Sequence, residues 1–224
     1  MDKNYDEAYT KIKYKIIHFH YLPGAKVTES TFRKDLEMGR TPVREALIRI
    51  EREGLINVVP QSGTFITKIN MNTATNGRFV RECIEPQIML EAVMKITSQN
   101  YVNLSHNLAQ QTEAITNRQP DLFFDLDQEF HREFYVAANK LEVWDWLQLN
   151  NMQLNRFRRL RLRVPNLKWE TLSNQHVKIL DTVRQRNVDE LSFLLRNHLH
   201  LMLDEQESVI DQYQDYFEEP LTNN

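Results

Sequence analysis

Apolar residues recur at helical spacing at the start of the chain. Tyr9, Ile12 and Ile16 lie three or four residues apart, which places them on one face of a helix over about residues 5–20. The run Leu22-Pro23-Gly24 is a strong turn signal and is expected to end this element. The chain therefore opens with an amphipathic helix whose apolar face needs a packing partner.

Two further helices are predicted directly afterwards. The first should run from an N-cap at Thr28 to near Leu36, because a threonine hydroxyl can accept a hydrogen bond from an amide of the first turn. The second should run from an N-cap at Thr41 to about Glu53. It would have Pro42 at its first helical position, where a missing N–H costs nothing.

The pattern then changes from helical to strand-like. Residues 55–59 are short and rich in β-branched side chains, residues 60–63 have turn chemistry, and residues 64–67 are again strand-like. These segments predict a two-stranded hairpin. Three helices followed by a β-hairpin, in this order, describe a winged helix-turn-helix.

The rest of the chain shows no convincing strand, and its periodicity predicts helices only. We expect a mainly α protein, in which the N-terminal winged helix-turn-helix is followed by an all-α antiparallel helical bundle. The expected domains are residues 1–70 and 71–212, with a frayed tail over 213–224. The helices of the bundle are expected at about 73–98, 101–117, 120–139, 141–163, 170–186 and 188–211.

Composition is compatible with a cytoplasmic globular protein. The hydrophobic content is 41% and the charged content 26%, and no apolar run approaches the roughly 20 residues of a membrane span. The N-terminus has no signal-peptide pattern, so we expect no membrane association and no secretion. The only cysteine, Cys83, excludes an internal disulfide framework and fits a reducing compartment.

Charge is distributed unevenly between the two predicted domains. Residues 1–70 contain 12 Lys+Arg and 9 Asp+Glu, a balance of +3, and the remainder has 28 − 12 = 16 basic and 31 − 9 = 22 acidic residues, a balance of −6. A weakly basic first domain followed by an acidic second domain is compatible with nucleic-acid binding by the first domain. The contrast is small, so charge alone does not decide the function.

The third helix has features of a recognition helix. Arg40, Thr41 and Arg44 lie at its start and one turn further on, where such a helix meets base edges and phosphates in the major groove. Arginine suits this role because its planar guanidinium can pair bidentately with guanine or phosphate. The hairpin tip, Gln61, Ser62 and Gly63, would lie along a neighbouring groove. The alternative is a solvated amphipathic helix with incidental arginines.

Four residues of the second domain have the chemistry of a metal site. Asp127 and His131 are four apart and share one helical face, His176 opens a second helix, and His198 lies on a third. One carboxylate and three imidazoles suit a borderline first-row metal such as zinc, nickel or manganese. The alternative is that these are isolated polar residues, which are common on amphipathic helices.

The first domain resembles the GntR superfamily of winged-helix repressors. The resemblance rests on the segment 40–47 (RTPVREAL), with LPGA at 22–25, EGLI at 53–56 and SGTFI at 62–66. It implies a homodimer that binds a short palindromic operator on double-stranded DNA. Three positions depart from the family pattern, because Ser30 replaces a common arginine, Glu37 replaces the usual turn glycine and Gly39 replaces the usual serine before Arg40.

The second domain resembles the FCD ligand-binding domain of the FadR-type GntR subgroup. The resemblance rests on the segment 127–131 (DQEFH), on AAN at 137–139, on HVKILD at 176–181 and on His198. It implies that Asp127, His131, His176 and His198 bind a divalent metal, zinc first, inside a helical bundle. It also implies that small carboxylates reach this metal as effectors.

Other polar residues remain open to two interpretations. Arg81 can face the effector cavity, as the family resemblance suggests, or form a surface pair with Glu85. Asn139, eight residues after His131, can line the cavity or end its helix. A dense run of arginines is expected to form a solvated helix edge, since its members do not share one face; these are Arg156, Arg158, Arg159, Arg161 and Arg163.

The sequence thus predicts a metabolite-responsive transcription regulator rather than an enzyme. Two alternatives stay open. The four ligands could activate water in a metal-dependent hydrolase, for which only Glu129 offers a general base. The metal could also be purely structural in a regulator whose effector binds elsewhere.

Overall fold

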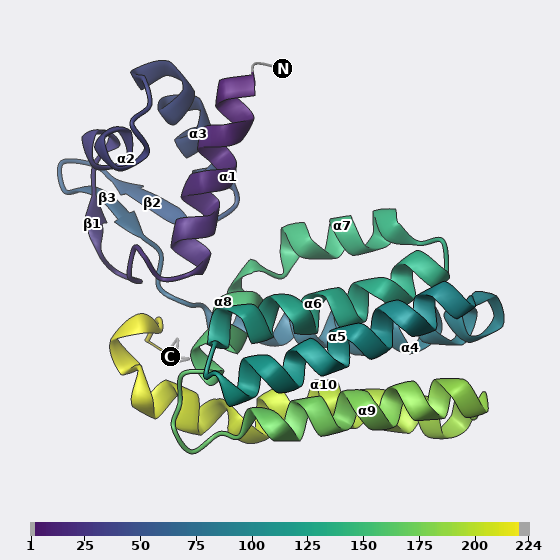
Figure 1. The fold of residues 1–224 in the computed structure, drawn as a ribbon. Coiled ribbons are helices and arrows are strands. Elements are labelled where there is room, and N and C mark those ends of the chain that lie inside the picture. The colour runs from purple at the N-terminus through teal and green to yellow at the C-terminus, as the bar shows by residue number, and fades with distance from the viewer. Residues whose placement is uncertain (1–2, 220–224) are drawn as a thin grey trace. The chain divides into compact units, whose positions relative to one another are not determined.

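The computed structural model describes residues 3–219 of the chain. It divides into two compact units, one made of the N-terminal residues up to Met71 together with the C-terminal segment from Tyr213, and one made of residues 72–212 (Figure 1). The described residues contain ten α-helices, one short 3-10 helix and one small antiparallel sheet. None of the helices described is both long and apolar enough to cross a membrane.

Three helices form the body of the N-terminal unit, as predicted. They are α1 (Lys3–Ile17), α2 (Glu29–Leu36) and α3 (Arg40–Arg52). Ile12 and Ile50 are fully buried where α1 packs against α3, so the apolar faces read from the sequence meet each other.

The N-cap predicted for α2 is confirmed, and the N-cap predicted for α3 is wrong. Thr28 caps α2 as predicted, because its hydroxyl oxygen accepts a hydrogen bond from the amide of Thr31 at 3.0 Å. The N-cap of α3 is Gly39, not Thr41, so the helix starts two residues earlier than expected. Pro42 therefore occupies the third helical position, which it tolerates because the first four amides of a helix have no intrahelical acceptor.

The sheet contains one strand more than the predicted hairpin. Strands β2 (Ile56–Val59) and β3 (Gly63–Ile66) pair antiparallel with Val59 opposite Gly63, and β1 (Lys26–Val27) adds to the free edge of β3. The strand order is β1-β3-β2. A two-residue strand carries no period-2 signal, which is why the sequence did not reveal β1.

The C-terminal segment is ordered where a frayed tail was expected. After the 3-10 turn η1 (Gln214–Tyr216), the amide of Ile69 donates to the carbonyl of Tyr216 at 2.8 Å, and the amide of Glu218 donates to the carbonyl of Ile69 at 3.0 Å. Phe217 is buried and the ring of Tyr216 stacks on Phe19. Burial of one aromatic side chain holds the segment, and residues 220–224 of the predicted tail lie outside the described residues.

The second unit is an all-α bundle. Its core joins residues from most of its helices, including Met89, Phe130, Phe134, Ile179 and Leu195. The helices are α4 (Met71–Lys95), α5 (Ser98–Thr116), α6 (Pro120–Ala137), α7 (Leu141–Asn150), α8 (Met152–Arg161), α9 (Trp169–Gln185) and α10 (Val188–Gln212).

The helix predicted over 141–163 is in fact two helices. The helix is interrupted at Asn151, which is both the C-cap of α7 and the N-cap of α8. Its side chain is buried and approaches Gly77 of α4 so closely that a Cβ at Gly77 would lie 2.8 Å from Asn151 Oδ1. The break depends on this tertiary contact and on the low helix propensity of asparagine, so apolar periodicity alone did not show it.

Candidate metal centre and nucleic-acid interface

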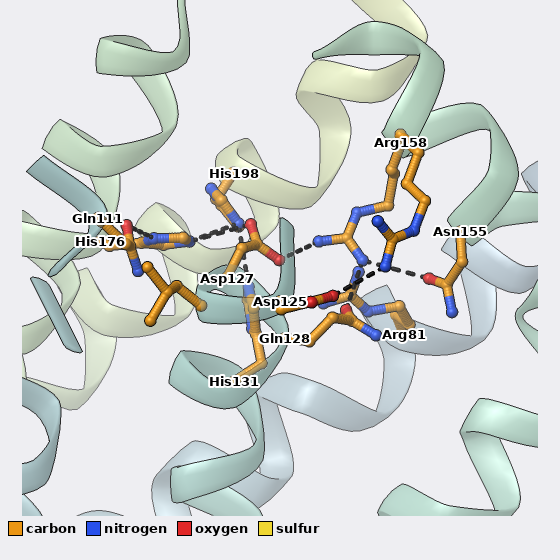
Figure 2. A network of polar contacts seen from close by, with 12 residues as sticks. Arg81, Gln111, Asp125, Asp127, Gln128, His131, Asn155, Arg158, His176 and His198 are labelled. Carbon is orange, nitrogen blue, oxygen red and sulfur yellow. Dashed lines mark hydrogen bonds and ion pairs between the residues drawn. The ribbon is translucent and has the colours of Figure 1, made fainter. Parts of the chain in front are cut away.

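Three helices bring the four predicted ligands together. Asp127 and His131 come from α6, His176 from α9 and His198 from α10, and one ligand atom of each lies within 4.8 Å of the others (Figure 2). All four side chains are buried. Residues separated by up to 71 positions therefore form one cluster in the bundle.

Each histidine is oriented by an oxygen at its outer ring nitrogen. His131 Nδ1 lies 2.9 Å from Glu85 Oε2, and His176 Nδ1 lies 3.0 Å from Gln111 Oε1. His198 Nδ1 lies 2.8 Å from Gln175 Oε1. An oxygen of this kind accepts a hydrogen bond, so each Nδ1 carries the proton and each Nε2 carries a lone pair.

The three Nε2 atoms face one another. His198 Nε2 lies 3.2 Å from His131 Nε2 and 3.3 Å from His176 Nε2, and Asp127 Oδ1 lies 3.7 Å from His176 Nε2. With every Nδ1 protonated, the centre contains three nitrogen lone pairs and a carboxylate, and no hydrogen-bond donor among them. Such a concentration of electron pairs in a buried space would be compensated by a cation, and its ligand types fit a divalent metal.

The electrostatic environment keeps the ligands in their metal-binding protonation states. Burial lowers the pKa of His176 to about 3 and the pKa of His198 well below its ordinary value, so both imidazoles are neutral at pH 7. Burial alone would raise the pKa of Asp127, but the charge of Arg158 holds it far below its usual range. The carboxyl is therefore ionised.

The cation beside Asp127 is Arg158, which the sequence had placed on a solvated edge. Its Nη2 atom forms an ion pair with Asp127 Oδ2 and its Nη1 atom donates to Gln128 Oε1 at 2.7 Å (Figure 2). This residue adjoins the predicted ligand set and was missed. A signal that could have found it is the excess of carboxylates on α6, which need cationic partners.

The rest of the arginine run is also largely buried, so the prediction of a solvated edge was wrong. Arg159 pairs with Asp121 and Asp125, and Arg161 makes two bonds of 2.7 and 2.8 Å to Glu205. These partners come from α6 and α10, more than thirty residues away in sequence. Arg156 is fully buried, and Arg163, like Arg158, is half-buried.

Of the two predicted effector-contacting residues, the structure brings one to the site. Arg81 lines a cavity of about 60 Å³ that also reaches Asp127 and His198, and its Nε donates to Glu85 Oε1 at 2.5 Å. The pair is therefore buried rather than on the surface. Asn139 is exposed in the left-handed conformation (φ 59°) just after α6 and is not among the cavity-lining residues, which matches its alternative interpretation as a helix end.

The predicted DNA-contacting residues of α3 lie on its exposed side. Arg40, Thr41 and Arg44 are all exposed, while Val43 and Ala46 face the core. Arg40 makes a weak, largely exposed ion pair with Glu29 at 3.2 Å, and Arg44 has no ion pair with any described residue. Both guanidinium groups are thus accessible to an external anion.

The hairpin tip between β2 and β3 is a tight turn. The amide of Ser62 donates to the carbonyl of Val59 at 3.0 Å, and Gln61 has a left-handed backbone with φ of 62°. Gly63 has φ of 124°, a conformation that side chains rarely allow, and a Cβ there would lie 2.7 Å from Lys26 Cε. Gln61 and Ser62 are exposed, so the tip can approach a partner.

Comparisons with known proteins agree with this architecture. Residues 4–66 match the bacterial regulatory proteins of the gntR family, and residues 78–201 match the FCD domain. The HTH-type transcriptional repressor RspR of Escherichia coli K12 is 30% identical over 95% of this chain and 93% of its own. The Nta operon transcriptional regulator of Aminobacter aminovorans is 26% identical over 84% of this chain and 88% of its own.

A solved structure gives the same fold. E. coli McbR/YncC superposes with a TM-score of 0.77 at 17% identity, covering 96% of this chain and 100% of that one. The chain therefore belongs to the GntR family and carries an FCD domain, as the sequence motifs indicated. It is a DNA-binding transcription regulator and not an enzyme.

Proposed function

We propose that the chain is a metabolite-responsive regulator that binds a short palindromic operator as a homodimer and is released or modulated by a small carboxylate at a metal centre. One observation carries the proposal. Three Nε2 lone pairs and the carboxylate of Asp127 form a buried cluster inside the helical unit, and the same chain carries a winged helix.

The metal would be held by Asp127, His131, His176 and His198. Imidazole and carboxylate ligands suit zinc first, with nickel or manganese as alternatives. A bound ion would supply positive charge and open coordination positions for an anion. The cavity beside Asp127 and His198 supports a ligand at that position, since arginines contribute to its wall.

The DNA contact would be made by α3 and the hairpin tip. Arg40, Thr41 and Arg44 would enter the major groove, and residues 61–63 (Gln61, Ser62 and Gly63) would follow the neighbouring groove. In a homodimer the two recognition helices would contact half-sites about one helical turn apart, ~34 Å.

The exposed face of α4 is a candidate dimer surface. Five uncharged residues at helical spacing are exposed on it, with the partly exposed Glu91 between the last two; they are Asn76, Phe79, Cys83, Gln87 and Met94. Phe79 and Met94 are 58% and 74% exposed, which is unusual for large apolar side chains on a charged protein. A second copy of the chain, which would present the same face, would cover them in a symmetric contact.

The ligand would bind one conformation of the helical unit more tightly than another. It would thereby shift the equilibrium between them and change the affinity of the protein for DNA. If the metal is purely structural, chelation lowers the melting temperature but carboxylates have no effect on DNA binding. A metal-dependent hydrolase is disfavoured by the family. Its one candidate base, Glu129, is exposed and pairs with Arg132.

The test is a thermal-shift and DNA-binding screen on the full-length protein. Chelated protein is reloaded with zinc, nickel or manganese, and each form is titrated with carboxylates and with DNA from upstream of its own gene. We expect metal to raise the melting temperature, carboxylates to raise it further only in the metal-loaded form, and salt-sensitive DNA binding that carboxylates weaken. His176→Ala should abolish both shifts and His106→Ala, at an exposed position, should keep them; absence of metal binding by the wild type would refute the metal centre.

A further inference from the structure

The cavity beside the metal centre has an unusual lining. Its apolar wall includes Phe123, Phe124, Leu162, Leu172 and Met202. Apart from its apolar members, every side chain that lines it is charged or an imidazole, and among the described residues of the lining there is no neutral hydroxyl or amide. These polar side chains are Arg78, Arg81, Asp127, Arg158, Arg161, His198 and Glu205.

The hydrogen-bond acceptors of this lining are already engaged. Asp127 pairs with Arg158, and Glu205 accepts both bonds from Arg161. His198 Nε2 points at the other histidines of the metal centre. A ligand hydroxyl or ammonium group would therefore compete with these arginines for the same carboxylates, and each buried donor left without a partner costs about 1–3 kcal/mol.

Donors, by contrast, are in surplus. Arg78 Nε, Arg81 Nη2 and Arg161 Nη1 are buried and have no hydrogen-bond partner among the described residues. All three arginines line the cavity. Buried guanidinium donors that lack partners favour a ligand that brings acceptors, and an ionised carboxylate brings the strongest ones.

The charge of the cavity sets the number of carboxylates. Its four arginines pair with four carboxylates, so these charges sum to 4 − 4 = 0; the pairs are Arg78–Glu82, Arg81–Glu85, Arg158–Asp127 and Arg161–Glu205. The histidines of the centre are neutral when they bind metal. A divalent ion therefore leaves two uncompensated positive charges, which a dianion would neutralise.

We infer that the effector is a dicarboxylate with an apolar carbon body and with neither hydroxyl nor amino groups. This inference rests on the proposed function and narrows its ligand class. One carboxylate lies at the Asp127 and His198 end of the cavity and the other meets the surplus donors of Arg78 and Arg161. The apolar wall covers the carbon chain between them. Sugar acids and amino acids should bind more weakly, because their hydroxyl and ammonium donors would compete with the arginines for Asp127 and Glu205.

The test is isothermal titration of the zinc-loaded protein with compounds matched in length. Succinate, glutarate and adipate are compared, and the tightest is then set against three relatives of the same carbon number. These are the monocarboxylate, the hydroxylated dicarboxylate and the amino dicarboxylate; for adipate they are hexanoate, glucarate and 2-aminoadipate. We expect the plain dicarboxylate to bind about tenfold or more tightly than each relative.

A variant localises the second carboxylate. Arg78→Met should remove most of the preference for the dicarboxylate over the monocarboxylate and leave zinc affinity unchanged. The matched control is Arg132→Met, which alters an arginine whose ion pair is exposed. Equal or tighter binding of the hydroxylated, amino or monocarboxylate relative overturns the inference, as does failure of all three dicarboxylates to bind. Zinc binding and DNA binding are measured separately, so the proposed function can survive that result.

Discussion

His131 Nδ1 lies 2.9 Å from Glu85 Oε2, and both side chains are buried. Glu85 comes from α4 and His131 from α6, and Arg81 holds the other carboxylate oxygen of Glu85 at 2.5 Å. Arg81 and His131 lower the pKa of Glu85 to about 2 although burial alone would raise it. The carboxylate thus fixes the tautomer of His131 and links the cavity arginine to the metal ligands.

Removal of this link should weaken metal binding without removing a ligand. We expect Glu85→Leu to lower zinc affinity about 10–100-fold, because His131 loses the acceptor that orients its ring and raises its basicity. Competition with a chromogenic chelator measures the affinity. Glu82→Leu, one turn away in the pair with Arg78, is the matched control and should bind zinc like the wild type. Equal loss in both variants would assign the effect to general destabilisation of α4.

The metal-free protein should become less stable as the pH is lowered. Burial lowers the pKa of His176 to about 3, whereas an unfolded histidine titrates near 6.5. Between these values the unfolded chain binds a proton that the folded chain excludes, so the free energy of unfolding decreases as the pH drops below 6.5. His198 acts in the same direction, and Glu85 adds to it below pH 4.5.

Urea unfolding of chelated protein between about pH 7.5 and 5.5 checks this dependence. His176→Gln should make the dependence on pH shallower, and His106→Gln, at an exposed position on α5, should leave it unchanged. A wild-type stability that is constant over this interval would show that the buried histidines do not control it.

Glu37 occupies a position that favours glycine. It ends α2 with φ of 55° and ψ of 36°, and its amide donates to the carbonyl of Arg33. A left-handed conformation costs a non-glycine residue roughly 1 kcal/mol, so Glu37→Gly should stabilise the winged helix by up to about that amount. Thermal unfolding measures the change.

The same position tests the effect of charge on DNA affinity. Glu37→Gln keeps the strained backbone and removes the negative charge, so it should tighten DNA binding without the stabilisation. If the glutamine variant is as stable as the glycine variant, the strain argument fails.

Phe217 should stabilise the N-terminal unit although it lies near the end of the chain. Its ring is 4% exposed, and Phe→Ala at buried positions costs about 3–5 kcal/mol. We expect Phe217→Ala to increase hydrogen–deuterium exchange in the peptides of α1 and α3. Phe193→Ala, at a position that is 63% exposed on α10, is the control. Unchanged exchange in α1 and α3 would mean that the C-terminal segment contributes nothing to this unit.

The sequence predicted what local patterns encode. Apolar periodicity gave most helices, and turn chemistry gave the hairpin. The break at Asn151 and the strand at Lys26–Val27 were missed, because both depend on partners distant in sequence. Residues 213–219 of the predicted frayed tail were misjudged for the same reason, since Phe217 packs against residues distant in sequence.

The candidate site shows the same division. The four proposed ligands were chosen from their residue types and from a family resemblance, and the structure brings them into one cluster. Arg158 was not, because its burial depends on Asp127, which lies 31 positions away on another helix. From the sequence alone, an arginine run whose residues point in several directions is expected to be exposed to solvent. In the folded chain, carboxylates of α6 and α10 lie beside these arginines and form ion pairs with them.

The central claim is that an anion at the metal centre controls DNA binding by the winged helix. Fluorescence anisotropy with DNA from upstream of the gene tests it most directly, on zinc-loaded and on chelated protein, each with and without the tightest-binding dicarboxylate. We predict that the ligand weakens DNA binding about tenfold or more in the zinc-loaded form only, a coupling of ordinary size for an allosteric protein. Arg44→Ala should weaken DNA binding in every condition and reduce its salt dependence. Equal DNA affinity with and without a saturating ligand in the zinc-loaded protein would contradict the account.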